Sequence, residues 1–224
     1  MKTRSELEIE LATLICQKLE ESIKNNGDAT LLVSGGSTPV NLFKLLSNKD
    51  INWKKVNIIP VDERFLPDGH PDQNGTLIRQ HLLVNNASKA NFVALILNST
   101  DAMLNLTSAG IAIKKITRPF TVVILGMGTD GHSASLFPCC KELEQGLDLN
   151  NTADLIITNP TSAPYQRISF NRSALLNTEN LYLHCYGEEK KQILNALDVS
   201  TEKKYPIKAF IDQNNIKPEI FWSK

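Results

Sequence analysis

The stretch Phe120-Thr-Val-Val-Ile-Leu125 is a run of apolar and β-branched residues, followed at once by Gly126-Met-Gly-Thr-Asp-Gly-His132. A run of this length that ends in glycines is typical of a buried strand with a tight exit loop. In open α/β sheets, ligands bind beyond the carboxyl ends of the strands. The aspartate and histidine of this loop therefore stand where a catalytic or binding loop is expected.

Helices and strands are expected to alternate along the rest of the chain. Apolar residues at helical spacing predict a first helix over residues 4–25. Strands are expected at residues 29–33, 56–61, 92–97, 154–158, 167–170, 181–186 and 220–222, and further helices at 40–46, 72–83, 101–116 and 188–197. This alternation predicts an α/β fold with a mostly parallel, doubly wound sheet and helices on both faces. The short spacing between residues 167 and 181 indicates an antiparallel excursion, and a helical turn at residues 173–176 is the alternative.

The composition limits the domain organisation and the partners. The 224 residues contain 24 basic and 24 acidic side chains. Because no linker-like segment divides them, we expect one domain over residues 1–224. The charge balance argues against nucleic acid and anionic membranes as partners. A charged N-terminus and the lack of an apolar stretch of ~20 residues lead us to expect a cytoplasmic protein.

Metal and cofactor motifs are not evident in the sequence. The four cysteines lack C-x-x-C spacing, and the four histidines lack spacing of the H-E-x-x-H kind. The glycines at positions 35 and 36 fit neither the P-loop pattern nor the dinucleotide-binding pattern. We therefore expect no cofactor and no required metal.

The segment Ser34-Gly-Gly-Ser-Thr-Pro39 joins an expected strand to an expected helix. Glycines allow a ligand to approach the backbone closely, and the hydroxyls and the N–H groups at a helix start can hold an anion. Taken alone, so short a motif is slightly more often a turn with a Ser/Thr helix cap. The segment is thus a candidate phosphate-binding loop that needs support from its surroundings.

The triplet Asp62-Glu63-Arg64 closes the strand expected at residues 56–61. The planar guanidinium of Arg64 suits a phosphate or a carboxylate. Alone, such a triplet is more often a solvated strand end with surface ion pairs. Its position at the same edge of the sheet as loop 34–39 favours a part in anion binding.

His132 is the candidate acid or base, because an imidazole titrates near neutral pH, and Asp130 is close enough to orient it. If His132 begins a helical turn at residues 133–137, the helix N-terminus would disfavour the imidazolium and help to keep a neutral base. Alternatively, His132 has no catalytic role and is a half-buried histidine at a capped helix start. No G-x-S-x-G elbow surrounds Ser133 or Ser135, so a serine nucleophile is not indicated.

Five segments taken together resemble the glucosamine-6-phosphate isomerase/6-phosphogluconolactonase family, in order and spacing from the first helix nearly to the C-terminus. They are residues 33–39, 61–64, 126–138, 167–170 (Arg-Ile-Ser-Phe) and 187–190 (Gly-Glu-Glu-Lys). The resemblance is to the lactonases of this family, and it implies the sheet fold that they share with the deaminases. It also implies hydrolysis of 6-phospho-D-glucono-1,5-lactone to 6-phospho-D-gluconate in the oxidative pentose phosphate pathway, with this phosphorylated sugar lactone as the small-molecule partner.

The resemblance also implies roles for individual residues. His132 would be the general base that activates water, with Asp130 supporting the loop or the imidazole. The other implied residues bind substrate: Gly35, Gly36, Ser37 and Thr38 would line the pocket, and Arg64, Arg167 and Lys190 would neutralise the 6-phosphate. The chain departs from the common family pattern at Thr129, Ser133, Cys139 and residues 72–75, and none of these departures removes a reactive group.

Two other functions fit part of the pattern. In a glucosamine-6-phosphate deaminase or isomerase, Asp62 would move protons at carbon and His132 would assist ring opening. Deaminases typically continue the Asp-Gly-His segment toward Asn-Glu-Pro, whereas this chain reads Ser-Ala-Ser-Leu-Phe-Pro. A non-catalytic phosphosugar sensor would keep the pocket, but the chain carries no recognisable helix-turn-helix and retains both Asp130 and His132.

Overall fold

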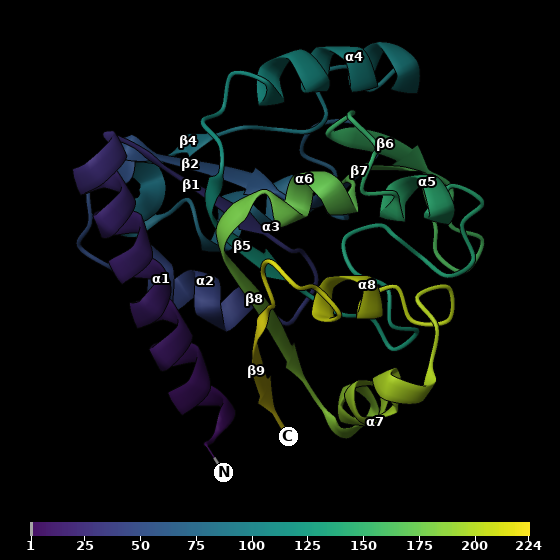
Figure 1. The fold of residues 1–224 in the computed structure, drawn as a ribbon. Coiled ribbons are helices and arrows are strands. Elements are labelled where there is room, and N and C mark those ends of the chain that lie inside the picture. The colour runs from purple at the N-terminus through teal and green to yellow at the C-terminus, as the bar shows by residue number, and fades with distance from the viewer. Residues whose placement is uncertain (1) are drawn as a thin grey trace.

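The computed structural model describes residues 2–224, which form a six-stranded sheet and a three-stranded sheet (Figure 1). The larger sheet is parallel throughout, with strand order β4-β2-β1-β5-β8-β9. Its strands are β1 (Ala29–Val33), β2 (Val56–Pro60), β4 (Asn91–Phe92), β5 (Phe120–Leu125), β8 (Thr178–Tyr186) and β9 (Glu219–Ser223). The predicted parallel α/β sheet is confirmed.

The central strands are apolar throughout because both of their faces are covered. In β1, Leu31 and Val33 join one buried cluster while Leu32 joins another on the opposite face. The first cluster packs under α1 (Arg4–Asn26), α2 (Val40–Ser47) and α3 (Asn74–His81). The second packs under α4 (Ala102–Ile113), α5 (Leu143–Leu147), α6 (Arg172–Leu176), α7 (Glu188–Ala196) and α8 (Lys208–Ile211). Figure 1 shows α1 and α2 together on the left, apart from α4 at the top and α8 at the right.

Local signals set the ends of several helices. α1 begins with a capping box between Thr3 and Glu6 and ends at Gly27, whose φ of 88° suits a glycine. Asp101 caps α4 through its side chain, so the helix expected from residue 101 begins at the next residue. Short 3-10 helices lie at Trp53–Lys55, Asn85–Lys89 and Leu197–Val199. None of the helices in residues 2–224 has the combination of length and apolar character that a membrane crossing requires.

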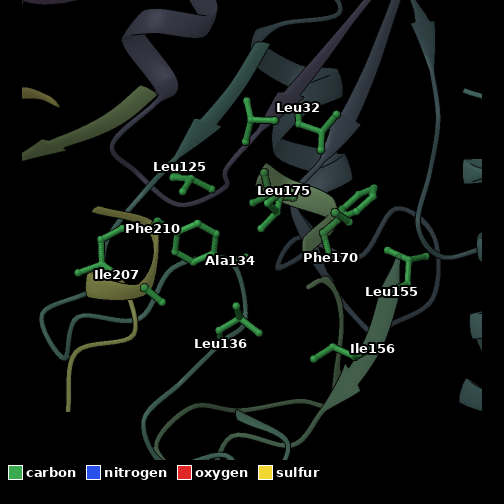
Figure 2. Close-up of a cluster of buried hydrophobic side chains, with 14 of the residues drawn as sticks. Leu32, Leu125, Ala134, Leu136, Leu155, Ile156, Phe170, Leu175, Ile207 and Phe210 are labelled. Atoms are coloured by element: carbon green, nitrogen blue, oxygen red, sulfur yellow. The ribbon is translucent and has the colours of Figure 1, made fainter. Parts of the chain in front are cut away.

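The smaller sheet is antiparallel and has the order β3-β7-β6, with β3 at Asp62–Arg64, β6 at Leu155–Thr158 and β7 at Arg167–Phe170. The triplet 62–64 is therefore a strand of this second sheet and not the end of β2. The expected antiparallel excursion exists, but β7 pairs with β3 and β6 and not with β8, and the segment expected as a possible helical turn at 173–176 is helix α6. Figure 2 shows Leu155, Ile156 and Phe170 of the smaller sheet in one cluster with Leu32 and Leu125 of the larger. This shared core holds the smaller sheet beside the larger one.

The strand expected at residues 92–97 is wrong beyond its first residue. β4 pairs with β2 only at Asn91 and Phe92. From there the backbone is held by a side chain, because the amide of Asn105 donates to the Leu95 carbonyl at 2.9 Å and accepts the Leu97 N–H at 2.7 Å. Leu95 and Ile96 of this run are buried and Leu97 is exposed, so the run has the apolar composition of a core strand without its burial pattern.

Candidate active site

A cavity of about 520 Å³ lies at the carboxyl ends of β1 and β5, between the exit loops of these strands, the smaller sheet and the start of α7. Most of the residues predicted from the sequence line it. They are Gly35, Gly36, Ser37, Thr38, Arg64, His132, Arg167 and Lys190. Asp130 is not among the lining residues and lies behind His132. These side chains therefore meet beyond the carboxyl ends of the parallel strands, where open α/β sheets bind their ligands.

His132 and Asp130 form a close pair. His132 Nδ1 lies 2.6 Å from Asp130 Oδ1, and the same oxygen accepts the His132 backbone N–H at 3.1 Å. Burial opposes ionisation of Asp130, but the hydrogen bonds from His132 outweigh it and hold the pKa of this carboxyl below its ordinary value. Because the carboxylate accepts the proton of Nδ1, Nε2 is the ring nitrogen with a free lone pair. The Phe137 ring stacks on the imidazole at a centroid distance of 3.9 Å.

No helix begins at His132, so the expectation that a helix N-terminus would disfavour the imidazolium is wrong. Residues 133–136 form a turn closed by a bridge between Ser133 and Leu136, and Ala134 has a left-handed φ of 49°. Long-range bonds hold this conformation. Ser135 donates its hydroxyl to Asp62 Oδ2 at 2.5 Å and its N–H to Ser169 Oγ at 3.1 Å. These bonds to the smaller sheet outweigh the local tendency to form a helix.

The smaller sheet brings Arg64 and Arg167 together, because the β3–β7 register places these two residues opposite each other. One Nη atom of Arg64 donates to the Asp72 carbonyl, and Nη2 of Arg167 donates to the Pro164 carbonyl at 2.9 Å. The Nε atoms of both arginines are buried and have no partner within residues 2–224. Burial lowers the pKa of Arg167, with partial compensation from Asp62. Two adjacent guanidinium groups with unused donors form a site suited to a phosphate.

Lys190 does not join this arginine pair through any contact of its own. It lies in the first turn of α7, with Nζ 5.4 Å from the centroid of the Tyr186 ring. It lines the same cavity from a different element. The structure therefore places two of the three predicted phosphate-binding cations side by side and the third on a separate wall.

Asn74 lines the cavity although the sequence did not single it out. Its amide donates to the Asp62 carbonyl at 2.8 Å, and its Oδ1 is buried without a partner in the described chain. A Cβ on Gly35 would lie only 1.8 Å from this oxygen, so the close approach of loop 34–39 to Asn74 requires glycine. The only sequence signal was that residues 72–75 depart from the family pattern.

Glu63 explains how Asn74 is positioned. Its buried carboxylate accepts the N–H groups of Asn74 at 2.8 Å and Gly75 at 2.6 Å, which are the first two residues of α3. It also accepts the N–H of Arg64 at 2.7 Å. Burial raises the pKa of Glu63 to about 7 although these bonds oppose the rise. One carboxyl group thus ties the start of α3 to the strand that carries Arg64.

The two strand-exit loops are joined to each other. Ser34 Oγ donates to the Ile124 carbonyl at 3.0 Å and accepts the Gly126 N–H at 2.8 Å. In loop 34–39, Gly36 has a φ of 84°, a conformation that favours glycine. Within the part of the chain that the structure describes, no group of His, Cys, Asp and Glu side chains is arranged to hold a metal ion.

Comparison with known proteins places the chain in a family. The sequence profile of the glucosamine-6-phosphate isomerases/6-phosphogluconolactonase family matches residues 2–222. A 6-phosphogluconolactonase of Rhizobium meliloti is 36% identical over 95% of this chain and 92% of its own length. One from Neisseria meningitidis is 33% identical over 96% of this chain and 93% of its own length. The crystal structure of a 6-phosphogluconolactonase from Shewanella baltica matches with a TM-score of 0.95 and 41% identity, covering 100% of this chain and 96% of that one.

The fold and the cavity define an α/β protein whose histidine–aspartate pair and paired arginines share one site at the carboxyl ends of a parallel sheet. The chain belongs to the glucosamine-6-phosphate isomerase/6-phosphogluconolactonase family. The family resemblance predicted from five sequence segments is thereby confirmed.

Proposed function

We propose that this protein hydrolyses 6-phospho-D-glucono-1,5-lactone to 6-phospho-D-gluconate, in the oxidative pentose phosphate pathway. The observation that carries the proposal is that one cavity contains both an oriented imidazole and a pair of adjacent arginines. The first suits the activation of water, and the second suits the phosphate of the substrate. Relatives named 6-phosphogluconolactonase, which match nearly the whole chain, support the same reaction.

In the proposed reaction, His132 Nε2 takes a proton from a water molecule as its oxygen attacks the lactone carbonyl carbon. The imidazolium that forms is stabilised by the Asp130 carboxylate at Nδ1. Collapse of the tetrahedral intermediate breaks the bond between the carbonyl carbon and the ring oxygen. His132 returns the proton to that oxygen, which becomes a hydroxyl group of the product. Arg64, Arg167 and Lys190 hold the 6-phosphate, and residues 35–38 pack against the sugar.

We also propose that the chain acts as a single cytoplasmic domain that needs neither metal nor cofactor and does not bind nucleic acid. The balance of 24 basic and 24 acidic side chains supports the absence of nucleic-acid binding. The hydrophobic core that the smaller sheet shares with the larger supports a single domain.

A coupled assay tests the function directly. A dehydrogenase generates the lactone from glucose 6-phosphate, and the appearance of 6-phosphogluconate is followed with and without the protein. We expect turnover well above the spontaneous hydrolysis of the lactone. The same preparation should release no ammonia from glucosamine 6-phosphate, the substrate of the other activity in the family description. Release of ammonia at enzyme-like rates, or no acceleration of lactone hydrolysis, would refute the assignment.

Gly128 provides a test of the geometry of the His132–Asp130 pair. A Cβ at this position would lie 2.3 Å from the His132 ring and 2.7 Å from Asp130 Oδ1. Gly128→Ala should therefore displace the imidazole and lower lactone turnover roughly 100-fold, the scale for a misplaced catalytic group. Gly110→Ala is the matched control, because a Cβ at Gly110 in α4 meets no atom within 4 Å. Unchanged turnover in a folded Gly128→Ala protein would count against the proposed alignment.

A further inference from the structure

His184 is a buried histidine of β8 that the proposed reaction does not use, although it lines the cavity. Its side chain is only 3% exposed. The Nδ1 atom is buried and has no hydrogen-bond partner in the described residues. A buried polar atom without a partner is unfavourable, and a bound ligand that donates a hydrogen bond would relieve this.

Glu8 of α1 orients the ring of His184. Its carboxylate is 1% exposed and lies with Oε1 3.6 Å from His184 Nε2. Arg4 Nε donates to Oε1 at 3.0 Å, and Asn41 Nδ2 donates to Oε2 at 2.5 Å. A carboxylate has only lone pairs to present, so the ring nitrogen that faces it carries the proton. The contact of 3.6 Å is longer than a hydrogen bond, and the charge of the carboxylate favours the tautomer with hydrogen on Nε2 and a lone pair on Nδ1.

The imidazole is neutral in this environment. Burial lowers the pKa of His184 to about 4, although the negative charge of Glu8 opposes this shift. Arg4 and Lys190, the two cations near the ring, lower it further. The ring of this cavity-lining residue therefore has an uncharged hydrogen-bond acceptor at Nδ1. This differs from the arginine pair, which offers only donors.

Arg4, which holds the Glu8 carboxylate, also contacts loop 34–39 at the border of the cavity. Arg4 Nη2 donates to the Thr38 carbonyl at 3.0 Å, and the Arg4 guanidinium lies 4.0 Å from the centroid of the Tyr186 ring. The N-terminal helix thereby fixes both His184 and loop 34–39. A ligand enclosed between them meets an acceptor whose direction is set before it binds.

We propose that His184 is a specificity-determining residue that accepts, through Nδ1, a hydrogen bond from a hydroxyl group of the bound phosphosugar. This inference rests on the proposed function for the identity of the ligand. The ligand class is a polyhydroxylated sugar phosphate, because a hydroxyl group is the uncharged donor that such a molecule carries away from its phosphate. A ligand that lacks this hydroxyl would leave Nδ1 unpaired and bind more weakly.

The test compares His184→Leu with the parent protein in lactone hydrolysis and in binding of the product, 6-phosphogluconate. We expect KM and the Kd of the product to rise about tenfold in the variant, the scale of one hydrogen bond, with kcat changed less than about twofold. His184→Asn, which places an amide oxygen near the position of Nδ1, should restore most of the affinity. Cys185→Ala is the control, because Cys185 packs in the cluster on the opposite face of the sheet and should leave KM unchanged.

Deoxygenated derivatives of 6-phosphogluconate identify the hydroxyl. One of them should bind the parent protein about tenfold more weakly and bind His184→Leu as tightly as 6-phosphogluconate does. A Kd and KM unchanged in a folded variant, or a loss of affinity equal for all derivatives, would overturn the proposal. If the leucine variant does not fold, His184→Phe keeps a planar ring without Nδ1. Product binding is measured without turnover, so absence of lactonase activity refutes the proposed function and leaves the test of His184 intact.

Discussion

His132→Ala is expected to lower kcat for lactone hydrolysis by roughly two to four orders of magnitude, the usual contribution of a general base. The physical reason is the geometry of the pair, in which the 2.6 Å contact between His132 Nδ1 and Asp130 leaves Nε2 as the basic nitrogen. Alanine removes that nitrogen and opens a small space beside Phe137. The coupled assay, corrected for spontaneous hydrolysis, measures the effect.

Two further variants show whether the loss in His132→Ala is specific to the His132–Asp130 pair. His81→Ala should leave kcat unchanged, because His81 lies at the end of α3 and does not line the cavity. Asp130→Asn should give an intermediate loss, since an amide does not stabilise the imidazolium as a carboxylate does. The His132→Ala protein should unfold at nearly the same temperature as the parent. Near-normal kcat in this folded variant would exclude His132 as the base.

Arg64→Ala is expected to raise KM for the lactone about 10- to 100-fold, because a hydrogen bond to a charged group contributes ~1.5–3 kcal/mol. Arg64 and Arg167 are opposite each other in the β3–β7 register, and the buried Nε of each has no partner in residues 2–224. A phosphate bound between them would use these free donors. Since the phosphate is remote from the reacting carbonyl, kcat should fall much less than KM rises.

The unphosphorylated lactone isolates the contribution of the phosphate. With glucono-1,5-lactone as substrate, kcat/KM should be low in the parent protein and nearly the same in Arg64→Ala. Arg79→Ala is the matched control, because Arg79 pairs with Asp68 at 3.1 Å, does not line the cavity, and should leave KM unchanged for both substrates. Equal effects of Arg64→Ala on both lactones would show that Arg64 does not act through the phosphate.

Much of the fold could be predicted because its signals are local. The apolar run 120–125 became β5, and the helical spacing at the N-terminus became α1. The prediction was wrong at residues 92–97 and 133–137. In both segments a side chain from another element binds the backbone, Asn105 of α4 in the first and Ser169 of β7 in the second. Local periodicity contains no information about such partners.

The candidate site was only partly accessible from the sequence. Its motifs identified loop 34–39, Arg64 and His132, because strand-exit loops with glycines and charged residues have a recognisable local pattern. Asn74 and His184 were missed as site residues. Asn74 is placed by the buried carboxylate of Glu63, and His184 is oriented by Glu8 of the N-terminal helix. Each partner lies in a different element of the fold, and neither arrangement has a characteristic spacing.

Periodicity and short motifs were enough to predict most of the strands and helices, the edge of the sheet at which chemistry is expected, and the family, although β3, α5 and α8 were not predicted. The packed structure was needed to show that Arg64 lies opposite Arg167, that His132 is not at a helix start, and that Nδ1 of His184 is buried without a partner in the described residues. Each of these depends on the register between strands or on burial against a distant element. Those quantities arise from packing, and no local stretch of sequence contains them.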